Sequence, residues 1–295
     1  MTRQRGTRRF PLDHVDERTL IKETDTPRTR ESLSRDLRAL GMEAGMVVEV
    51  HSSLSRLGWV CGGSVAVVQA LMDVVTEEGT LVMPTQTVHY TDPAKWRHPP
   101  VPPSWLSVLY EQMPAFDPRV TPSRLMGQIA EIFRTWPGVV RSNHPMVSFA
   151  AWGKHAQIIT TNHSLDYGLG EGSPLARIYD LDGFVLLLGA SWTTCTSLHL
   201  AEYRARNPTQ TTERSPILEE GKRVWRTYQD IELDTTQFLD IAGEFESEYA
   251  DQDIVKTAYV GSALARLFPQ RLAVDAAVKW IEQWNPLRQE ASEMR

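Results

Sequence analysis

A histidine and a glutamate lie three residues apart, directly after an apolar run. His199 and Glu202 belong to TSLHLAEYRA, which follows GFVLLLGASWTTC. The apolar run predicts a buried strand and the next residues a helix with Thr196 as its N-cap, so both side chains would share one helix face. A histidine that a carboxylate holds in one tautomer can act as a general base. The same spacing also fits an ordinary ion pair on a solvated helix face.

The chain has two cysteines, Cys61 and Cys195, and eight histidines. Without a CxxC pair, the cysteines argue against a disulfide framework and favour a reducing compartment. The histidines show neither HxH nor HxxxH spacing, so we expect no metal site. Cys195 could be a catalytic nucleophile only if the imidazole of His199 reached its sulfur, and a small buried hydrophobe is the alternative interpretation.

A second group of candidate residues follows another predicted strand. HSSLSRLG at residues 51–58 leads to Gly62, Gly63 and Ser64 at a helix start. Backbone N–H groups at such a start can bind a phosphate or an extended amide chain, although a plain Gly-Gly helix start is the alternative. No lysine follows the glycines, so this is not a P-loop. GLGEGS at residues 168–173 follows HSLDY rather than an apolar strand, which excludes a dinucleotide fingerprint.

An acidic run offers carboxylates to a cationic ligand. In DIELD, Glu232 and Asp234 alternate with apolar residues, so both acids would point to one face of a strand. They are either the solvated face of an edge strand or a pair ready to bind an amine. If residues 88–122 fold over the same cleft, further acids could join them: Asp92, Asp166 and Glu202.

The bulk composition is that of an ordinary globular chain. Its 295 residues are 41% hydrophobic and 23% charged, which is enough for a sizeable core. The net charge of −6 gives no general argument for binding nucleic acid or a membrane. No apolar stretch approaches the roughly 20 residues that a membrane helix needs, and the basic start MTRQRGTRRF has no apolar segment behind it. We therefore expect a cytoplasmic protein, either a monomer or a homodimer.

The order of predicted elements indicates an α/β fold with a central mixed sheet. Residues 1–28 are polar and unpatterned, which predicts a flexible basic tail, and residues 29–295 would form a single domain. Strand, helix and strand alternate between residues 46 and 86, as in a βαβ unit. Residues 88–122 combine a cluster of prolines with several aromatic residues and are interpreted as an inserted lid. Residues 236–285 look largely helical.

Several blocks taken together resemble the aminoglycoside 3-N-acetyltransferase family. They occur in order between residues 30 and 285 and include VVQALMDVV, NHPMVSFAAWG, NHSLDYGLGEGSPLARI, TSLHLAEYRA and WRTYQDIELD. The resemblance implies an acetyl-CoA-dependent enzyme whose mixed sheet is surrounded by helices, in a fold distinct from that of the GNAT acetyltransferases. In agreement, RALGME, RQRGTR and RLMGQI all fail at the last position of the GNAT pyrophosphate loop.

The resemblance also implies roles for individual residues. His199 matches the general base, and Glu202 matches the acid that orients this base or contacts the substrate. The residues that match the coenzyme A site are Ser52, Ser53, Gly62, Gly63, Ser64, Ser173 and Leu175. We assign to the substrate site three of the acids named above and two residues of the NHSLDY block: Asp92, Glu232, Asp234, His163 and Tyr167.

The implied reaction is acetylation of the 3-amino group of a 2-deoxystreptamine aminoglycoside, which confers antibiotic resistance. Coenzyme A and a cationic aminoglycoside would be the partners, without metal, nucleic acid or membrane. Three alternatives stay open: an acyltransferase of the same fold acting on a non-antibiotic amine, a hydrolase that uses Cys195, and a coenzyme A-binding module without turnover.

Overall fold

The computed structural model describes residues 16–293, with side chains as far as residue 283. At its centre is a seven-stranded mixed sheet with the order β3-β4-β2-β1-β5-β9-β8. β1 pairs in parallel with β2 and β5, while β4 and β9 run antiparallel to their inner neighbours. The strands are β1 Val47–Ser52, β2 Thr80–Pro84, β3 Val140–Arg141, β4 Phe149–Gly153, β5 Phe184–Leu188, β8 Lys256–Val260 and β9 Ala263–Pro269.

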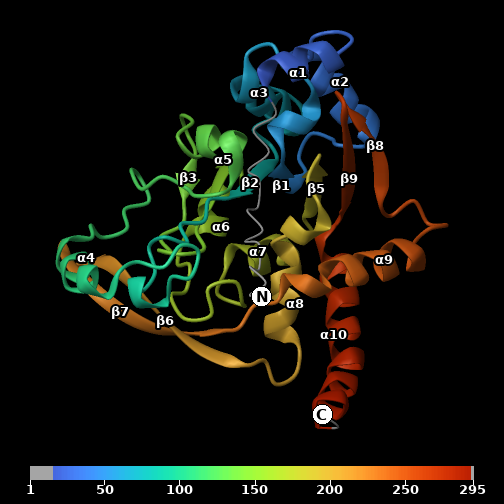
Figure 1. Cartoon of the computed structure of the whole chain (residues 1–295). Coiled ribbons are helices and arrows are strands. Elements are labelled where there is room, and N and C mark those ends of the chain that lie inside the picture. Colours follow the sequence, from blue (N-terminus) through green and yellow to red (C-terminus); the bar gives the residue numbers. More distant parts are fainter. Residues whose placement is uncertain (1–15, 294–295) are drawn as a thin grey trace, which may run out of the picture.

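Helices cover both faces of this sheet (Figure 1). Because side chains alternate along a strand, Val48 and Val50 of β1 face one apolar core and Val47 faces the other. The helices on the first face are α2 Arg30–Leu40, α3 Gly63–Val75 and α5 Gly127–Arg134. Those on the second face are α6 Ala156–Thr160, α7 Pro174–Asp180, α8 Ser197–Arg204, α9 Phe238–Glu248 and α10 Gln270–Glu293. The predicted fold class, a mixed sheet surrounded by helices, is confirmed.

Among residues 16–293, no helix is both long enough and apolar enough to cross a bilayer.

The parallel strands place two turns side by side at one edge of the sheet. Ser52, the last residue of β1, is paired with Leu188, the last residue of β5. β1 leads through the 3-10 helix η1 Leu54–Leu57 to α3, and β5 leads through η4 Trp192–Thr194 to α8. In open α/β sheets, ligands bind at this edge, beyond the carboxyl ends of the strands.

A long β-hairpin lies apart from the main sheet (Figure 1): β6 Gln210–Glu219 and β7 Lys222–Ile231. Residues 88–122 run along this hairpin and include η2 Pro93–Lys95, η3 Pro103–Trp105 and α4 Leu106–Gln112. Phe116 N–H donates to Pro216 O at 2.8 Å. Trp225 Nε1–H donates to Tyr110 O, also at 2.8 Å. The predicted lid is thus a segment packed on the hairpin, and its role as a lid stays a prediction.

Arg141 of β3 ties the end of this segment to the sheet. Its guanidinium donates to Thr85 O at 2.6 Å and to Thr121 O at 2.5 Å. It also donates to Pro118 O at 3.4 Å and lies 5.1 Å from the centre of the Phe116 ring. Burial lowers the pKa of Arg141 to about 10, so the group stays cationic at neutral pH. A buried cation therefore holds residues 116–121 in place through their carbonyl groups.

The predicted flexible tail is wrong for residues 16–28. Helix α1 Glu17–Glu23 packs beside Trp59, whose Nε1–H donates to Glu17 Oε1 at 3.2 Å. Trp59 N–H donates to Thr24 Oγ1 at 2.8 Å. The apolar contacts of this short helix are too few to show as a periodic sequence pattern. The rest of the predicted tail, residues 1–15, lies outside the described residues.

The prediction that residues 236–285 are largely helical is wrong for residues 256–269. These residues form the β8–β9 hairpin between α9 and α10, and it completes one side of the central sheet. Gly261 and Ser262 link the two strands. Side chains that alternate between buried and exposed on both sides of such a two-residue link are a hairpin signal. The helical pattern on either side concealed it.

Replacing Arg141→Met should lower the free energy of unfolding by about 3 kcal/mol, because buried carbonyl oxygens lose a charged donor. Urea denaturation measures this change, and faster tryptic cleavage at Lys95, Arg97 or Arg119 would report loosening of residues 88–122. The matched control is Arg226→Met, which removes an exposed guanidinium paired with Glu219. Equal stability of the two variants would contradict the role of Arg141.

Candidate active site

His199 and Glu202 form a hydrogen-bonded pair on α8, as the spacing predicts. His199 Nδ1 lies 2.5 Å from Glu202 Oε2, so Nδ1–H donates to the carboxylate. This bond selects the tautomer with an unprotonated Nε2. Within the described part of the chain, Nε2 makes no hydrogen bond, and the His199 side chain keeps 12% of its surface exposed. The geometry is that of a base whose accepting nitrogen is open to a ligand.

The second oxygen of Glu202 is held by the segment after β7. Asp234 N–H donates to Glu202 Oε1 at 2.7 Å, so the two oxygens have separate partners. The ring of Phe238 at the start of α9 lies 4.9 Å from the His199 ring. Glu202 and Phe238 together restrict the imidazole to one orientation. The base is therefore fixed before any ligand binds.

The residues just before the pair do not support a cysteine nucleophile. Cys195 is fully buried, and burial raises the pKa of its thiol well above the ordinary value, with the nearby charge of Glu49 acting in the same direction. A thiol kept protonated is a poor nucleophile. Thr196 is at the N-cap position as expected, but its side chain makes no capping hydrogen bond.

Asp230, which the sequence analysis did not select, is a buried acid beside the pair. It is 2% exposed, and its Oδ1 accepts from Tyr203 Oη at 2.5 Å and from Ile231 N–H at 2.9 Å. Burial raises the pKa of Asp230, and the Tyr203 hydrogen bond opposes this. The charge of Asp166 also raises this pKa, and a charge on His199 lowers it. These groups thus form one electrostatic unit around Nε2.

A pocket of about 570 Å³ lies at the carboxyl end of β1. It contains three of the predicted coenzyme A residues: Ser52, Ser53 and Gly63. The other two members of the glycine turn, Gly62 and Ser64, flank Gly63 at the start of α3. Gly62 and Gly63 have φ of 87° and 56°, a conformation that glycine adopts without strain. α1 supplies two more lining residues, Glu17 and Leu20.

Two helices begin at this pocket. Gly63 belongs to the first turn of α3, and Gly127, Gln128 and Ile129 belong to that of α5. Among the described residues, neither helix has a side chain capping its N-terminus. Uncapped N–H groups with the positive end of the helix dipole favour an anionic ligand such as a phosphate.

The pocket and the pair are joined through neighbouring residues of β1. Ser52 lines the pocket, and Thr196 N–H donates to His51 Nε2 at 3.3 Å on the other side of the strand. His199 is in the first turn after Thr196. The bond between Thr196 and His51 thus places the start of α8 at the end of β1, on the face opposite to Ser52.

Known proteins are similar to this chain in sequence. Residues 50–282 match the family described as aminoglycoside 3-N-acetyltransferase. The SPbeta prophage-derived aminoglycoside N(3')-acetyltransferase-like protein YokD of Bacillus subtilis is 50% identical over 262 residues, 88% of this chain and 95% of YokD. Aminoglycoside N(3)-acetyltransferase VII of Streptomyces paromomycinus is 38% identical over 281 residues, 91% of this chain and 96% of its own. The chain belongs to this family.

Solved structures agree with the sequence comparison. The crystal structure of YokD has a TM-score of 0.88 at 47% identity, covering 91% of this chain and 98% of that one. The aminoglycoside acetyltransferase AAC(3)-Xa has a TM-score of 0.83 at 38% identity, covering 92% and 98%. As a member of the aminoglycoside 3-N-acetyltransferase family, the chain is an acyltransferase, and the family recognised from its sequence blocks is confirmed.

In this acetyltransferase, two predicted coenzyme A contacts do not reach the pocket. Ser173 and Leu175 are both fully buried. Ser173 caps α7, where its side chain accepts from Ala176 N–H, and Leu175 packs in the apolar core of the second face. Ser173 and Leu175 belong to the block GEGSPLARI, and this block forms the start of α7. Their role as coenzyme A contacts stays a prediction.

His163, which is predicted to contact the substrate, is buried, and both of its ring nitrogens are hydrogen-bonded within the protein. Its Nε2–H donates to Gly168 O at 2.6 Å, and its Nδ1 accepts from Ser142 Oγ at 2.9 Å. The ring lies 4.8 Å from that of His144, whose Nε2–H donates to Leu165 O at 3.2 Å. The two rings thus fix the carbonyls of the loop that carries Asp166 and Tyr167.

The other predicted substrate residues are spread around the site. Tyr167 is 40% exposed, its hydroxyl donates to Gln210 at 3.0 Å, and its ring packs edge-on against Tyr203. Glu232 is exposed just beyond the end of β7. The carboxylate of Asp234 caps η5 Thr235–Gln237 rather than lining a strand. Asp92 accepts from Ala94 N–H and from Tyr110 Oη–H, both in the 88–122 segment, and within residues 16–293 it makes no hydrogen bond to His199 or Glu202.

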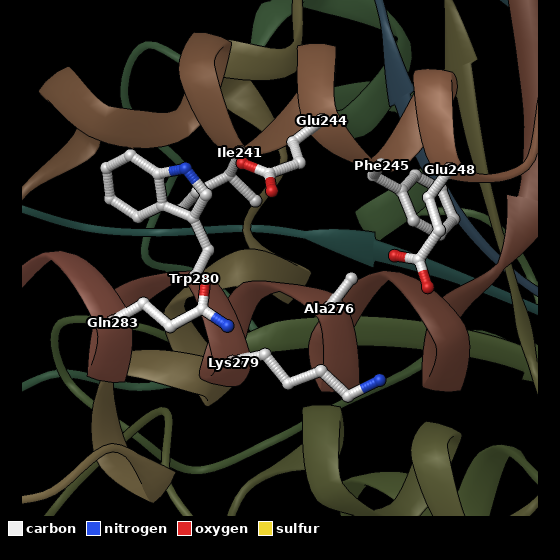
Figure 2. A pocket seen from close by; sticks show the side chains of 8 residues that line it. All are labelled: Ile241, Glu244, Phe245, Glu248, Ala276, Lys279, Trp280 and Gln283. Atoms are coloured by element: carbon white, nitrogen blue, oxygen red, sulfur yellow. The ribbon is translucent and has the colours of Figure 1, made fainter.

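A separate pocket of about 190 Å³ lies between α9 and α10 (Figure 2). Ile241 and Phe245 of α9 face Ala276 and Trp280 of α10, with Glu244, Glu248, Lys279 and Gln283 around them. Its volume is below the few hundred Å³ of typical small-molecule sites. It contains none of the candidate site residues. Among residues 16–293, no three His, Cys, Asp or Glu side chains are arranged to hold a metal ion.

The paired histidines predict a loss of stability in acid. Burial lowers the pKa of His144 to about 4 and that of His163 well below its ordinary value, so the unfolded chain binds their protons first. Their contribution is full above pH 6.5 and is lost as the pH falls from there toward 4, by about 3 kcal/mol for His144. Urea denaturation from pH 7 to 4 measures this. His144→Asn, which keeps a local acceptor, should flatten the profile; an unchanged profile would contradict the assignment.

Proposed function

We propose that this protein transfers the acetyl group of acetyl-CoA to the 3-amino group of a 2-deoxystreptamine aminoglycoside, with His199 as general base, and so confers resistance. The observation that carries the proposal is the hydrogen-bonded pair of His199 and Glu202 on α8, a helix whose N-cap residue Thr196 is bonded to His51 of β1, the strand that ends at the pocket. A general base and a site for an anionic, elongated cosubstrate are the two parts that this reaction needs.

The β1 pocket is the proposed coenzyme A site. Its uncapped helix starts suit the phosphate groups, and its hydroxyl and backbone groups at residues 52–53 suit the amide-rich pantetheine arm. A relative, AAC-IIIb, has been crystallised with CoASH and has a TM-score of 0.77 at 31% identity. We propose Ser52, Ser53, Gly62, Gly63 and Ser64 as contacts, together with the backbone N–H groups at the start of α5.

The acids near His199 form the proposed aminoglycoside site. Glu202 is hydrogen-bonded to His199, and the charges of His199 and Asp166 both act on Asp230. A polycationic sugar gains Coulomb energy from each carboxylate that is ionised. Glu232 and Tyr167 extend the surface along the β7 end and the 163–170 loop. A relative, AAC-VIa, has been crystallised with sisomicin and has a TM-score of 0.76 at 31% identity.

The reaction can proceed without a covalent enzyme intermediate. The substrate amine, held as a free base, attacks the thioester carbonyl while His199 Nε2 takes its proton. The C–N bond forms, the tetrahedral intermediate collapses, the C–S bond breaks and coenzyme A leaves as thiolate, which regains a proton from the imidazolium or water. Glu202 stabilises the imidazolium formed in this step, because its Oε2 already accepts from Nδ1–H.

The first test is release of free thiol from acetyl-CoA with a panel of aminoglycosides. We expect turnover by the wild type and a loss of about 100-fold or more in kcat for His199→Ala, the size expected of a general base. Cys195→Ala is the matched control, because it alters a buried neighbour without touching the base, and it should keep its activity.

The outcomes separate the alternatives. Binding of coenzyme A without thiol release with any aminoglycoside would reject the antibiotic substrate and turn attention to other amines. Equal kcat of wild type and His199→Ala would reject the mechanism. Loss of activity in Cys195→Ala with activity retained in His199→Ala would favour the hydrolase.

Asp230→Asn should raise the KM for aminoglycoside by about 10-fold to 100-fold, because a charged hydrogen bond to a substrate ammonium is lost. The KM for acetyl-CoA should stay the same, since Asp230 is outside the β1 pocket. Steady-state kinetics with each substrate varied in turn measures both values. Asp73→Asn on α3, which removes a surface ion pair with Arg30, is the control. A parallel rise in both KM values would contradict a substrate-binding role.

A further inference from the structure

A buried polar cluster lies beneath the first turn of α8 and is used by none of the steps above. It consists of Glu49 and His51 of β1, Ser197 of α8 and Gln270 at the start of α10, and we call it the β1–α8 cluster. All four residues are less than 9% exposed, and Glu49 is fully buried. A carboxyl group in an apolar core is costly unless its contacts compensate for lost hydration. The burial of Glu49 therefore indicates that this carboxyl group has a specific structural or functional role.

The cluster binds α8 at its first two residues. Ser197 Oγ–H donates to Glu49 Oε2, and the same Oγ accepts from Gln270 Nε2–H at 2.8 Å. Thr196 N–H donates to His51 Nε2 at 3.3 Å. The side chain of the N-cap residue Thr196 makes no capping hydrogen bond. The contacts from β1 and α10 therefore hold the start of α8 in place of a side-chain cap.

Glu49 and His51 also contact each other. Glu49 Oε1 lies 3.2 Å from His51 Nε2 but makes no hydrogen bond among the described residues. The single lone pair of Nε2 accepts from Thr196 N–H, so this nitrogen has no proton to give to Glu49. Each member of the pair is hydrogen-bonded to the start of α8 instead: Glu49 to Ser197, and His51 to Thr196.

We propose that Glu49 and His51 are positioning residues that set the place of the general base by fixing the first turn of α8. His199 is in this turn, two residues after Ser197. Glu202 and Phe238 orient the imidazole from outside, but they cannot correct a shift of the helix that carries it. The proposal rests on the proposed function, because it concerns the same base.

The two faces of β1 relate the β1–α8 cluster to the pocket. Glu49 and His51 are on one face of β1, and Ser52 on the opposite face lines the pocket for the acetyl donor. One strand thus fixes both the donor and the base. A change in the cluster should alter kcat, which depends on their alignment, and leave binding of each substrate as it was.

The test compares three variants of the full chain. Glu49→Leu removes all hydrogen bonds at nearly constant volume and should lower kcat by about 100-fold with both KM values unchanged. Glu49→Gln should retain most of the turnover, because its amide oxygen can still accept from Ser197 Oγ–H, the contact that holds α8. Ser197→Ala removes only the helix side of the contact and should lower kcat by about 10-fold. Ser34→Ala, a buried helix serine on α2, is the matched control and should change nothing.

A second measurement does not depend on activity. Amide hydrogen exchange of residues 196–204 should speed up in Glu49→Leu and Ser197→Ala but not in Glu49→Gln, while α3 and α10 stay protected. Faster exchange throughout the chain would show a general loss of stability and overturn the proposal. If Glu49→Leu does not fold, the kcat and the α8 exchange of Ser197→Ala test the proposal instead.

Failure of this inference is distinguishable from failure of the proposed function. If the wild type releases no thiol with any aminoglycoside, the function is rejected and exchange of α8 still tests the positioning role. If the wild type turns over while Glu49→Leu and Ser197→Ala keep its kcat and its α8 exchange, the positioning role is rejected and the function stands. If Glu49→Gln loses as much kcat as Glu49→Leu, the hydrogen bond to Ser197 is not what holds the base in place, and the positioning role of Glu49 is rejected.

Discussion

The candidate site depends on one carboxylate whose two oxygens are held by different parts of the chain. Glu202 accepts from His199 within α8 and from the Asp234 backbone after β7. The second bond requires the β6–β7 hairpin to return to the edge of the sheet where α8 begins. That return also brings Asp230 to the base, because Asp230 is the residue before the last one of β7. Orientation of the base and acidity of its surroundings thus have one structural origin.

The central strand β1 adds a constraint of its own. Its buried pattern has an apolar run interrupted by Glu49 and His51, two polar residues on the same face. An entirely apolar strand would pack as well against α7 and α8, so the polar residues need a reason beyond stability. Their contacts to Ser197 and Thr196 give one, because a helix that starts without a side-chain cap needs its first N–H groups bound from elsewhere.

Local spacing was sufficient for the features that depend only on neighbouring residues. His199 and Glu202 could be predicted as a pair because three residues along a helix bring side chains together whatever the rest of the chain does. The same holds for the glycines at the start of α3, because a glycine pair just before an apolar helical pattern predicts a helix start from neighbouring residues alone. The mixed sheet also followed from the alternation of strands and helices, although the β8–β9 hairpin was taken for helix.

Features set by tertiary contacts could not be read in the same way. Asp230 stands two residues before Glu232, and only the end of β7 at Ile231 decides that Asp230 turns inward while Glu232 lies beyond the strand. His163 is predicted as a substrate contact because its block is typical of the family, yet the ring on which it packs is that of His144, 19 residues away in the sequence. Ser173 and Leu175 belong to the same block, and their packing in and around α7 depends on tertiary contacts.

The burial of Cys195 bears on why the chemistry uses nitrogen rather than sulfur. The thiol is next to the helix that carries the base, but it lies in the core, where a thiolate would lose its hydration and face the charge of Glu49. The imidazole, four residues later, is on α8, where it is partly exposed and hydrogen-bonded to Glu202. Burial thus disfavours the thiol as a nucleophile, while the imidazole is the proposed base. An amine substrate that is itself a nucleophile needs only the base, which is why direct transfer from the thioester suits this site.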